Sequence, residues 1–219
     1  MLPVPRTKAQ ARASYDRMSR SYDLFAGAFE KRLRDQALER LGIATGETAL
    51  EIGFGTGHSL VQIAQAVGAN GRVHGVDLSA GMREVSQRRL DRTGMSKRVA
   101  LHCGDAAHLP YADETLDAVF MSFTLELFDT PEIPIVLGEI RRVLKPNGRL
   151  GVVSLSREDG ISLMVRVYEW LHQRLPQLID CRPIYVEQAL KEAGFQLTHS
   201  ERENLWGLPT KIAVGVKDL

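Results

Sequence analysis

A glycine-rich stretch near residue 50 offers the clearest chemistry in this chain. It reads Glu51-Ile-Gly-Phe-Gly-Thr-Gly57 and follows a short apolar segment, so that Gly53, Gly55 and Gly57 alternate with other residues. Glycine lets a backbone turn tightly and approach a ligand without a Cβ clash. A helix that begins after such a turn offers free N–H groups to a carboxylate or phosphate. The stretch predicts a ligand-binding loop, although a turn without any ligand explains this motif alone almost equally well.

Two acidic residues stand at the ends of the next two apolar segments. Asp77 comes 20 residues after Gly57, where an acid accepts hydrogen bonds from both hydroxyls of an adenosine ribose. Asp105 follows Cys103-Gly104, and a carboxylate there can accept a hydrogen from an adenine amino group. Each acid by itself is explained as a helix cap or an Asx turn. Glycine or aspartate at three successive strand ends favours a nucleoside-type ligand over three unrelated turns.

Spacing and composition argue against several other kinds of site. The glycines follow G-x-G-x-G rather than G-x-G-x-x-G, and no G-x-x-x-x-G-K-S/T phosphate loop occurs. The six histidines show no H-E-x-x-H motif, and Cys103 and Cys181 have no C-x-x-C spacing, so we predict no metal site and no disulfide framework. The 28 basic and 27 acidic residues leave a net charge of +1, which argues against a nucleic-acid partner.

The elements that must position these residues alternate along most of the 219 residues. Short apolar strands separated by amphipathic helices predict an α/β fold, with helices on both faces of a mostly parallel sheet and an antiparallel last strand. Ligands bind beyond the carboxyl ends of the strands in such sheets. The expected strands are 48–53, 72–77, 99–103, 116–121, 149–155, 195–201 and 210–217, and the expected helices are 9–41, 60–67, 80–90, 135–144, 161–175 and 186–193.

Together these residues resemble the class I S-adenosylmethionine-dependent methyltransferases, whose sheet is seven-stranded and Rossmann-like. The resemblance covers about residues 14–155 and includes Lys145-Pro-Asn-Gly148. The ubiquinone/menaquinone-biosynthesis methyltransferases are the most similar group, and they add Tyr22-Asp23, Leu109-Pro110 and Met121-Ser-Phe123. The resemblance implies S-adenosyl-L-methionine as the cofactor. It also implies that the cofactor is contacted by Tyr15, Tyr22, Glu51, Gly53, Gly55, Thr56, Gly57, Asp77, Leu78, Met82, Asp105, Ala106 and Ser122.

The residues expected on the acceptor side differ from those of the quinone-biosynthesis methyltransferases. Thr124-Leu-Glu-Leu127 stands where they have Gly-Leu-Arg-Asn, and Leu205-Trp-Gly-Leu-Pro209 replaces their glycine-rich C-terminal signature. The glycine stretch and the N-terminal Tyr-Asp pair are also similar to bacterial phospholipid N-methyltransferases. The predicted function is methyl transfer to a small apolar acceptor such as a quinone precursor or lipid, with phosphatidylethanolamine-type N-methylation as an alternative.

Two further classes stay open beside methyl transfer. A nicotinamide-dependent oxidoreductase uses a similar sheet, but the glycine spacing, Asp105 and the absence of a Tyr-x-x-x-Lys relay argue against it. A cofactor-binding protein without catalysis is also compatible with the motifs, because they report binding only.

Methyl transfer from a sulfonium requires alignment and exclusion of water rather than a metal, because charge disperses in the transition state. A base is required only when the acceptor is a hydroxyl or an acidic carbon. Tyr22, Asp23 and Glu126 are candidates for that base, but each is better explained as a structural residue, and none is assigned.

The segment before the first strand is predicted to be a helical lid or cap over residues 1–44. Residues 45–219 then form the methyltransferase domain, with a helical insertion on the acceptor side at about 156–190. Tyr15 and Tyr22 are seven residues apart, which places both on one face of a single helix. An apolar set in the insertion (Met164, Val165, Tyr168, Trp170 and Leu171) fits either an acceptor pocket or a plain core face.

The charged side chains near the N-terminus also bear on where in the cell the protein is located. Residues 1–20 carry five basic side chains and one acidic one, which suits a solvated face or a contact with anionic lipid. No secretory signal and no run of about 20 apolar residues is visible. We expect a cytoplasmic protein, with peripheral membrane contact through this segment as a further hypothesis; the sequence does not specify an oligomeric state.

Overall fold

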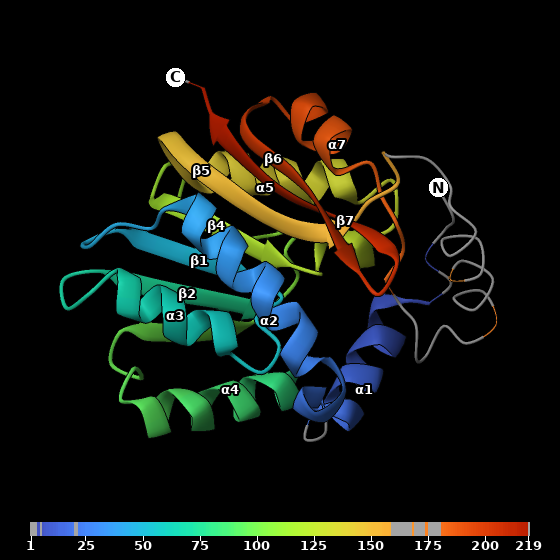
Figure 1. The fold of residues 1–219 in the computed structure, drawn as a ribbon. Helices are drawn as coiled ribbons and strands as arrows, with labels where there is room; N and C mark the ends of the chain where they lie inside the picture. Colours follow the sequence, from blue (N-terminus) through green and yellow to red (C-terminus); the bar gives the residue numbers. More distant parts are fainter. Residues whose placement is uncertain are drawn as a thin grey trace.

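A seven-stranded sheet forms the centre of the protein, in the strand order β3-β2-β1-β4-β5-β7-β6 (Figure 1). The computed structural model describes Val4, residues 6–19, 22–158, Tyr168, Arg174 and residues 181–218, without the side chains of residues 22–29. The strands are β1 (Thr48–Ile52), β2 (Arg72–Asp77), β3 (Val99–Cys103), β4 (Leu116–Ser122), β5 (Leu144–Leu155), β6 (Phe195–Leu205) and β7 (Leu208–Lys217).

Strands β1 to β5 run parallel, and β7 lies antiparallel between β5 and β6. The register pairs Ile52 with both Val76 and Met121, so the ends of β1, β2 and β4 lie side by side. The order reverses between β1 and β4, which is the topological switch point where open α/β sheets bind ligands. The predicted α/β class and antiparallel last strand are confirmed.

Helices cover both faces of the sheet (Figure 1). The helices are α1 (Lys8–Met18), α2 (Tyr22–Leu41), α3 (His58–Ala66), α4 (Ala80–Thr93), α5 (Ile133–Val143) and α7 (Val186–Glu192), with a short 3-10 helix η1 (Leu125–Leu127). Leu33, Leu60 and Leu90 of α2, α3 and α4 pack in one core cluster, whereas Leu137 and Leu190 of α5 and α7 pack in another. Because both faces are covered, the central strands are apolar on both sides.

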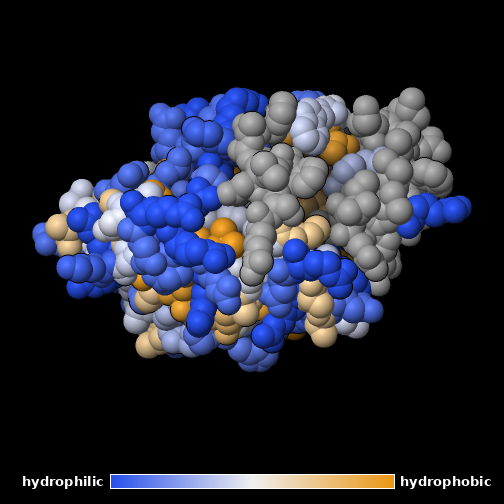
Figure 2. All heavy atoms as spheres, turned by 90° about the horizontal axis from the view of Figure 1, so that it is seen from below, coloured by the Kyte–Doolittle hydropathy of each residue, from blue (hydrophilic) through white to orange (hydrophobic). Residues whose placement is uncertain are grey.

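Helix α1 docks on the N-terminus of α4. Ser79 is the N-cap of α4 and accepts a hydrogen bond from the Met82 N–H at 3.0 Å. The Asp16 carboxylate of α1 accepts hydrogen bonds from the Ser79 hydroxyl and from the Gly81 N–H. A carboxylate is stabilised there by the free N–H groups and the dipole of α4. The lower face, where α1 and α4 lie, is largely hydrophilic with small hydrophobic patches (Figure 2).

The predicted single N-terminal helix is wrong, and so is the shared face of Tyr15 and Tyr22. Helix α1 ends at Met18 and α2 begins at Tyr22, so the two tyrosines lie in different helices. At the break, the Ser19 hydroxyl donates to the Asp16 carbonyl at 3.0 Å and satisfies one of the carbonyls at the helix end. The side chain of Tyr22 lies outside the described residues, and so does the expected helix at 161–175 apart from Tyr168 and Arg174.

Strand and helix boundaries elsewhere differ by a few residues. The largest differences are at β5, which begins at Leu144 rather than residue 149, and at β6, which continues to Leu205. Leu144 pairs with Leu116 before the register shifts, and Asn147 adopts a positive φ of 61°, so the expected turn at 145–148 is an irregularity within the strand.

Arg149 in β5 fastens the end of α2 to the sheet. Its guanidinium donates to the carbonyls of Leu41 and Gly42 at 2.7 and 2.6 Å and to both carboxylate oxygens of Glu47. We expect Arg149→Met to lower the free energy of unfolding by about 2–3 kcal/mol, because charged hydrogen bonds contribute more than neutral ones.

Urea unfolding followed by circular dichroism measures this loss. Arg40→Met is the control, since Arg40 makes one exposed ion pair with Glu201 at 3.4 Å and such pairs contribute below about 1 kcal/mol. Equal unfolding free energies for both variants would contradict the assigned role of Arg149.

Candidate active site

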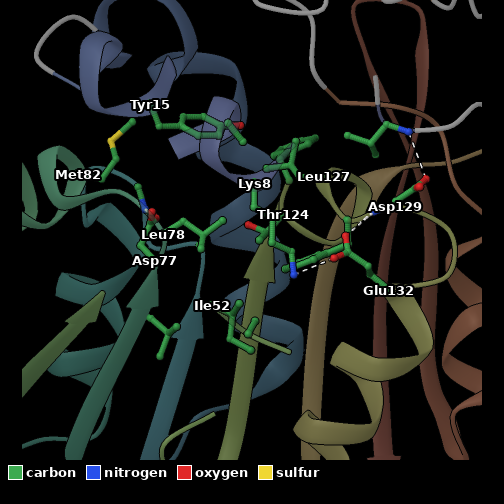
Figure 3. Close-up of a pocket in the computed structure, with 18 of the residues that line it drawn as sticks. Lys8, Tyr15, Ile52, Asp77, Leu78, Met82, Thr124, Leu127, Asp129 and Glu132 are labelled. Carbon is green, nitrogen blue, oxygen red and sulfur yellow. Dashed lines mark hydrogen bonds and ion pairs between the residues drawn. The ribbon is translucent and has the colours of Figure 1, made fainter. Parts of the chain in front are cut away.

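The carboxyl ends of β1, β2 and β4 open into a cavity of about 350 Å³ (Figure 3). Tyr15 and Lys8 of α1 line it from above the strand ends. Asp77, Leu78 and Met82 lie on one side of it, and Leu127, Asp129 and Glu132 on the other. The cavity therefore brings together three strand ends, the N-terminal helix and the segment that follows β4.

The glycine loop forms the floor of this cavity. Gly53 has a φ of +71°, and a Cβ there would lie 2.4 Å from the side chain of Thr124. Gly55 has a φ of +49°, and a Cβ there would meet nothing within 4 Å. The backbone at Gly55 therefore borders open space, and a ligand can approach it closely.

Helix α4 holds the glycine loop from behind. The Ser86 hydroxyl donates to the Gly55 carbonyl at 2.8 Å, and the Arg89 Nε donates to the Thr56 carbonyl at 2.7 Å. These carbonyls are satisfied on the side of α4, which fixes the loop in one conformation.

Asp77 connects the ends of β1 and β2. One carboxylate oxygen accepts from the Gly55 N–H at 3.0 Å, and the other accepts from the Ser79 N–H at 2.9 Å. Burial raises the pKa of Asp77 to about 6, although these backbone donors partly offset the rise. The carboxylate is therefore ionised at neutral pH, and each oxygen keeps a lone pair for a ligand hydroxyl.

Eight of the thirteen residues predicted to contact the cofactor line the cavity: Tyr15, Gly53, Gly55, Asp77, Leu78, Met82, Ala106 and Ser122. Glu51, Thr56, Gly57 and Asp105 are described by the structure and lie next to the cavity without lining it. The remaining residue, Tyr22, has no described side chain.

Glu51 is buried beneath the glycine loop, with 2% of its surface exposed. Burial raises its pKa to about 8, and the Ser59 hydroxyl and the charge of Arg34 only partly offset this. Glu51 is therefore largely protonated at pH 7 inside the protein. Its place under the N-terminal turn of α3 makes it a support of the loop in this structure.

Lys8 connects two sides of the cavity, which the sequence did not predict. Its ammonium group lies 2.6 Å from a carboxylate oxygen of Asp105 and 2.7 Å from one of Glu132. The other Asp105 oxygen accepts from the Ala107 N–H at 3.0 Å. The carboxylate expected to meet an adenine amino group thus holds a lysine here.

The remaining wall is more apolar, and the sequence pointed to only part of it, through the motif that ends at Phe123 and the departure at 124–127. Phe123, Leu127 and Phe128 line it, and the Val4 N–H donates to the Asp129 carboxylate at 3.2 Å. The Arg6 guanidinium lies 5.2 Å from the centre of the Tyr15 ring. Glu126, a candidate base, is fully buried and does not line the cavity.

In the part of the chain that the structure describes, no group of three histidine, cysteine, aspartate or glutamate residues could hold a metal ion. Within the same residues, no helix has the length and apolar character needed to cross a membrane.

The raised pKa of Glu51 predicts how stability changes with pH. The folded protein keeps a proton that the unfolded chain releases above pH 4.5, so stability falls as the pH rises toward 8. The slope for one such proton is at most about 1.4 kcal/mol per pH unit. We expect Glu51→Gln to flatten this decline between pH 6 and 8, most clearly above pH 7, where the Asp77 carboxylate, with its pKa of about 6, is already largely ionised.

Urea unfolding at pH 6, 7 and 8 measures the effect. Glu192→Gln, which alters an exposed carboxylate of α7, is the control and leaves the profile unchanged. A Glu51→Gln profile as steep as that of the unchanged protein would show that Glu51 does not carry the buried proton.

Comparisons with known proteins agree with this geometry. Residues 49–148 match a family described as a methyltransferase domain. The demethylmenaquinone methyltransferase of Lactiplantibacillus plantarum is 32% identical over 165 residues, which are 75% of this chain and 67% of that protein. The enzyme of the same name from Lactobacillus johnsonii is 33% identical over 65% of this chain and 57% of its own length. The chain thus spans less than two thirds of the length of the Lactobacillus johnsonii enzyme.

Solved structures share the fold. A SAM-dependent methyltransferase from Aquifex aeolicus superposes with a TM-score of 0.63 at 24% identity and covers 84% of this chain and 88% of its own. The cyclase SpnF superposes with a TM-score of 0.77 at 21% identity over 100% of this chain and 98% of its own. At these identities the similarity establishes the fold alone, and a methyltransferase and a cyclase share that fold.

Proposed function

The chain belongs to the class I S-adenosylmethionine-dependent methyltransferases, and from this premise we propose that it methylates a small apolar acceptor of the quinone-precursor type. One observation carries the proposal. A single cavity joins the Gly53–Gly55 loop and Asp77 on one side to the apolar wall of Phe123, Leu127 and Phe128 on the other. A polar adenosyl subsite beside an apolar acceptor subsite is what such a transfer requires.

The described residues fit S-adenosylmethionine. The open space at Gly55 accommodates a ligand against the backbone, and the Asp77 carboxylate is available to both ribose hydroxyls. Leu78, Met82 and Ala106 offer apolar surface to an adenine ring. We assign the adenine amino group to Asp105, which then shares its carboxylate with Lys8.

When bound, the cofactor supplies a methyl group on a positively charged sulfur. The residues of this chain have to align the acceptor with that methyl group and exclude water. Tyr15 and Lys8 of α1 cover the cavity and serve the second purpose. We propose α1, within the predicted 1–44 lid or cap, as the element that opens for the acceptor and closes over it. Helix α2 of the same region packs Leu33 and Leu41 in the core and stays in place.

The acceptor class follows from the wall and from the relatives. Phe123, Leu127 and Phe128 suit a planar apolar ring, and the two relatives named above are called demethylmenaquinone methyltransferases. No base is assigned, since Glu126 is buried away from the cavity and the side chain of Tyr22 is not described. Methyl transfer to a ring carbon of a reduced quinone is the reaction that we propose.

A radiolabelled-methyl assay tests this proposal. Labelled S-adenosylmethionine is incubated separately with reduced demethylmenaquinone, phosphatidylethanolamine vesicles and a small amine. We expect label in the quinol only, because the acceptor wall is apolar. Label in the phospholipid would replace the proposed acceptor, and cofactor binding without transfer to any of the three would contradict the proposed reaction.

The role of Asp77 predicts a pH dependence of cofactor binding. S-adenosylhomocysteine should bind with constant affinity above pH 7 and more weakly as the pH falls through about 6, where the carboxylate becomes protonated. We expect Asp77→Ala to weaken binding roughly ten- to a hundredfold, as charged hydrogen bonds are lost.

Calorimetric titrations between pH 5 and 8 measure both effects. Asp77→Asn is the matched variant, because it keeps the shape and removes the titration, so its weaker binding should not vary through pH 6. An Asp77→Asn protein with the original affinity and pH profile would refute the assignment.

A further inference from the structure

Two charged side chains that the cofactor site does not use are buried at the acceptor end of the sheet. Glu126 in η1 is 0% exposed, and Arg182, which precedes α7, is 1% exposed. Burying a charge is costly unless its partners are well placed. The partners of these two residues therefore indicate what the charges hold in position.

Glu126 ties η1 to the end of β5. A carboxylate oxygen of Glu126 accepts a hydrogen bond from the Leu155 N–H at 3.2 Å. Leu155 is the last residue of β5, at the same carboxyl edge as the cavity. The first turn after β4 is thus fixed to the neighbouring strand.

Arg182 holds the continuation of the same segment. One guanidinium nitrogen donates to the Phe128 carbonyl at 2.6 Å, and the other donates to the Thr130 hydroxyl at 3.2 Å. The carboxylates of Asp129 and Glu126 interact favourably with its charge. Arg182 therefore contacts the segment at a backbone carbonyl and at a hydroxyl, and two carboxylates of the segment attract its charge.

The backbone beside Arg182 is itself anchored to the sheet. The Ile184 N–H donates to the Leu155 carbonyl at 3.1 Å, and the Arg157 N–H donates to the Ile184 carbonyl at 3.0 Å. Ile184 is fully buried. Arg182 thus reaches the acceptor segment from a rigid base at the end of β5.

The segment from Leu125 to Glu132 supplies one entire side of the cavity. Leu127, Phe128, Asp129, Pro131 and Glu132 line it there, opposite Asp77 and Met82 (Figure 3). Asp129 and Glu132 also bind Val4 and Lys8 of the N-terminal segment. A shift of this segment would change the acceptor wall and its contacts with the N-terminal segment, while leaving the glycine loop in place.

We propose that Arg182, together with Glu126, is a positioning residue that fixes the acceptor wall and thereby sets the affinity for the acceptor without contributing to cofactor binding. The division into acceptor and cofactor sides rests on the proposed function. The contacts of Arg182 do not depend on the proposed function. A kinetic experiment therefore tests the effect on the acceptor, and hydrogen exchange tests the contacts.

The kinetic experiment uses the full chain with reduced demethylmenaquinone as the acceptor. We expect Arg182→Met to raise the acceptor KM or lower kcat/KM roughly ten- to a hundredfold, through the loss of charged hydrogen bonds. The Kd for S-adenosylhomocysteine should stay within about twofold. Arg182→Lys should recover part of the loss, because it keeps the charge and one donor.

Arg149→Met is the matched control for losing a well-bonded arginine. Arg149 is fastened to α2 rather than to the acceptor segment, so this variant should lower stability and leave the acceptor KM unchanged. Thr130→Val removes one partner of Arg182 at an exposed position and keeps the buried charge. It provides a second test if Arg182→Met does not fold, and it should raise the acceptor KM by a smaller factor.

Amide hydrogen exchange tests the contacts without any acceptor. With S-adenosylhomocysteine bound, Arg182→Met or Thr130→Val should speed exchange at Leu127, Phe128 and Ile133, whose N–H groups donate to the carbonyls of Thr124, Leu125 and Asp129. Exchange in β1 and β2 should not change. If the unchanged protein methylates no acceptor, the proposed function fails and exchange alone decides the role of Arg182.

Two results would overturn the proposal. One is Arg182→Met or Thr130→Val with an unchanged acceptor KM and unchanged exchange. The other is an equal loss of cofactor and acceptor affinity, which would make Arg182 a general structural residue.

Discussion

The hydrogen bond from the Gly55 N–H to the Asp77 carboxylate is the contact on which the rest of the site depends. It joins the loop after β1 to the end of β2 at 3.0 Å, and a second bond from the Ser79 N–H fixes the same carboxylate. Asp77 is thereby held at the floor of the cavity, where burial raises its pKa to about 6. Backbone donors partly offset this cost, so a largely ionised group is ready to meet ligand hydroxyls without reorganisation.

The proposed acceptor end also depends on buried charged groups that are held by hydrogen bonds. Glu126 and Arg182 are buried to hold the backbone near Leu127 and Phe128, whereas Lys8 reaches across to Glu132 and Asp105 from the N-terminal segment. The cavity is thus bounded by a rigid cofactor side and by an acceptor side that depends on contacts between distant segments. Such an arrangement lets the acceptor side vary within one fold while the glycine loop is kept.

The sequence predicted the parts of the fold that depend on local pattern. Apolar runs located the strands, and the strand-end residues Gly53, Gly55 and Asp77 do meet at one cavity. Contacts between distant segments could not be predicted, because a local pattern carries no information about them. Lys8 and Asp105 are 97 residues apart, and Arg182 and Phe128 are 54 apart. The break between α1 and α2 was missed for the same reason, since Asp16 of α1 is held by α4.

The central claim is that the strand-end cavity holds an S-adenosyl cofactor through Asp77. A crystal structure of the protein grown with S-adenosylhomocysteine tests it most directly. We expect both ribose hydroxyls within hydrogen-bond distance of the Asp77 carboxylate, with the adenine beside Leu78 and Ala106 and the homocysteine end on the Gly53–Gly55 loop. Electron density for the ligand elsewhere, or in this cavity with Asp77 bonded only to Gly55 and Ser79, would contradict it.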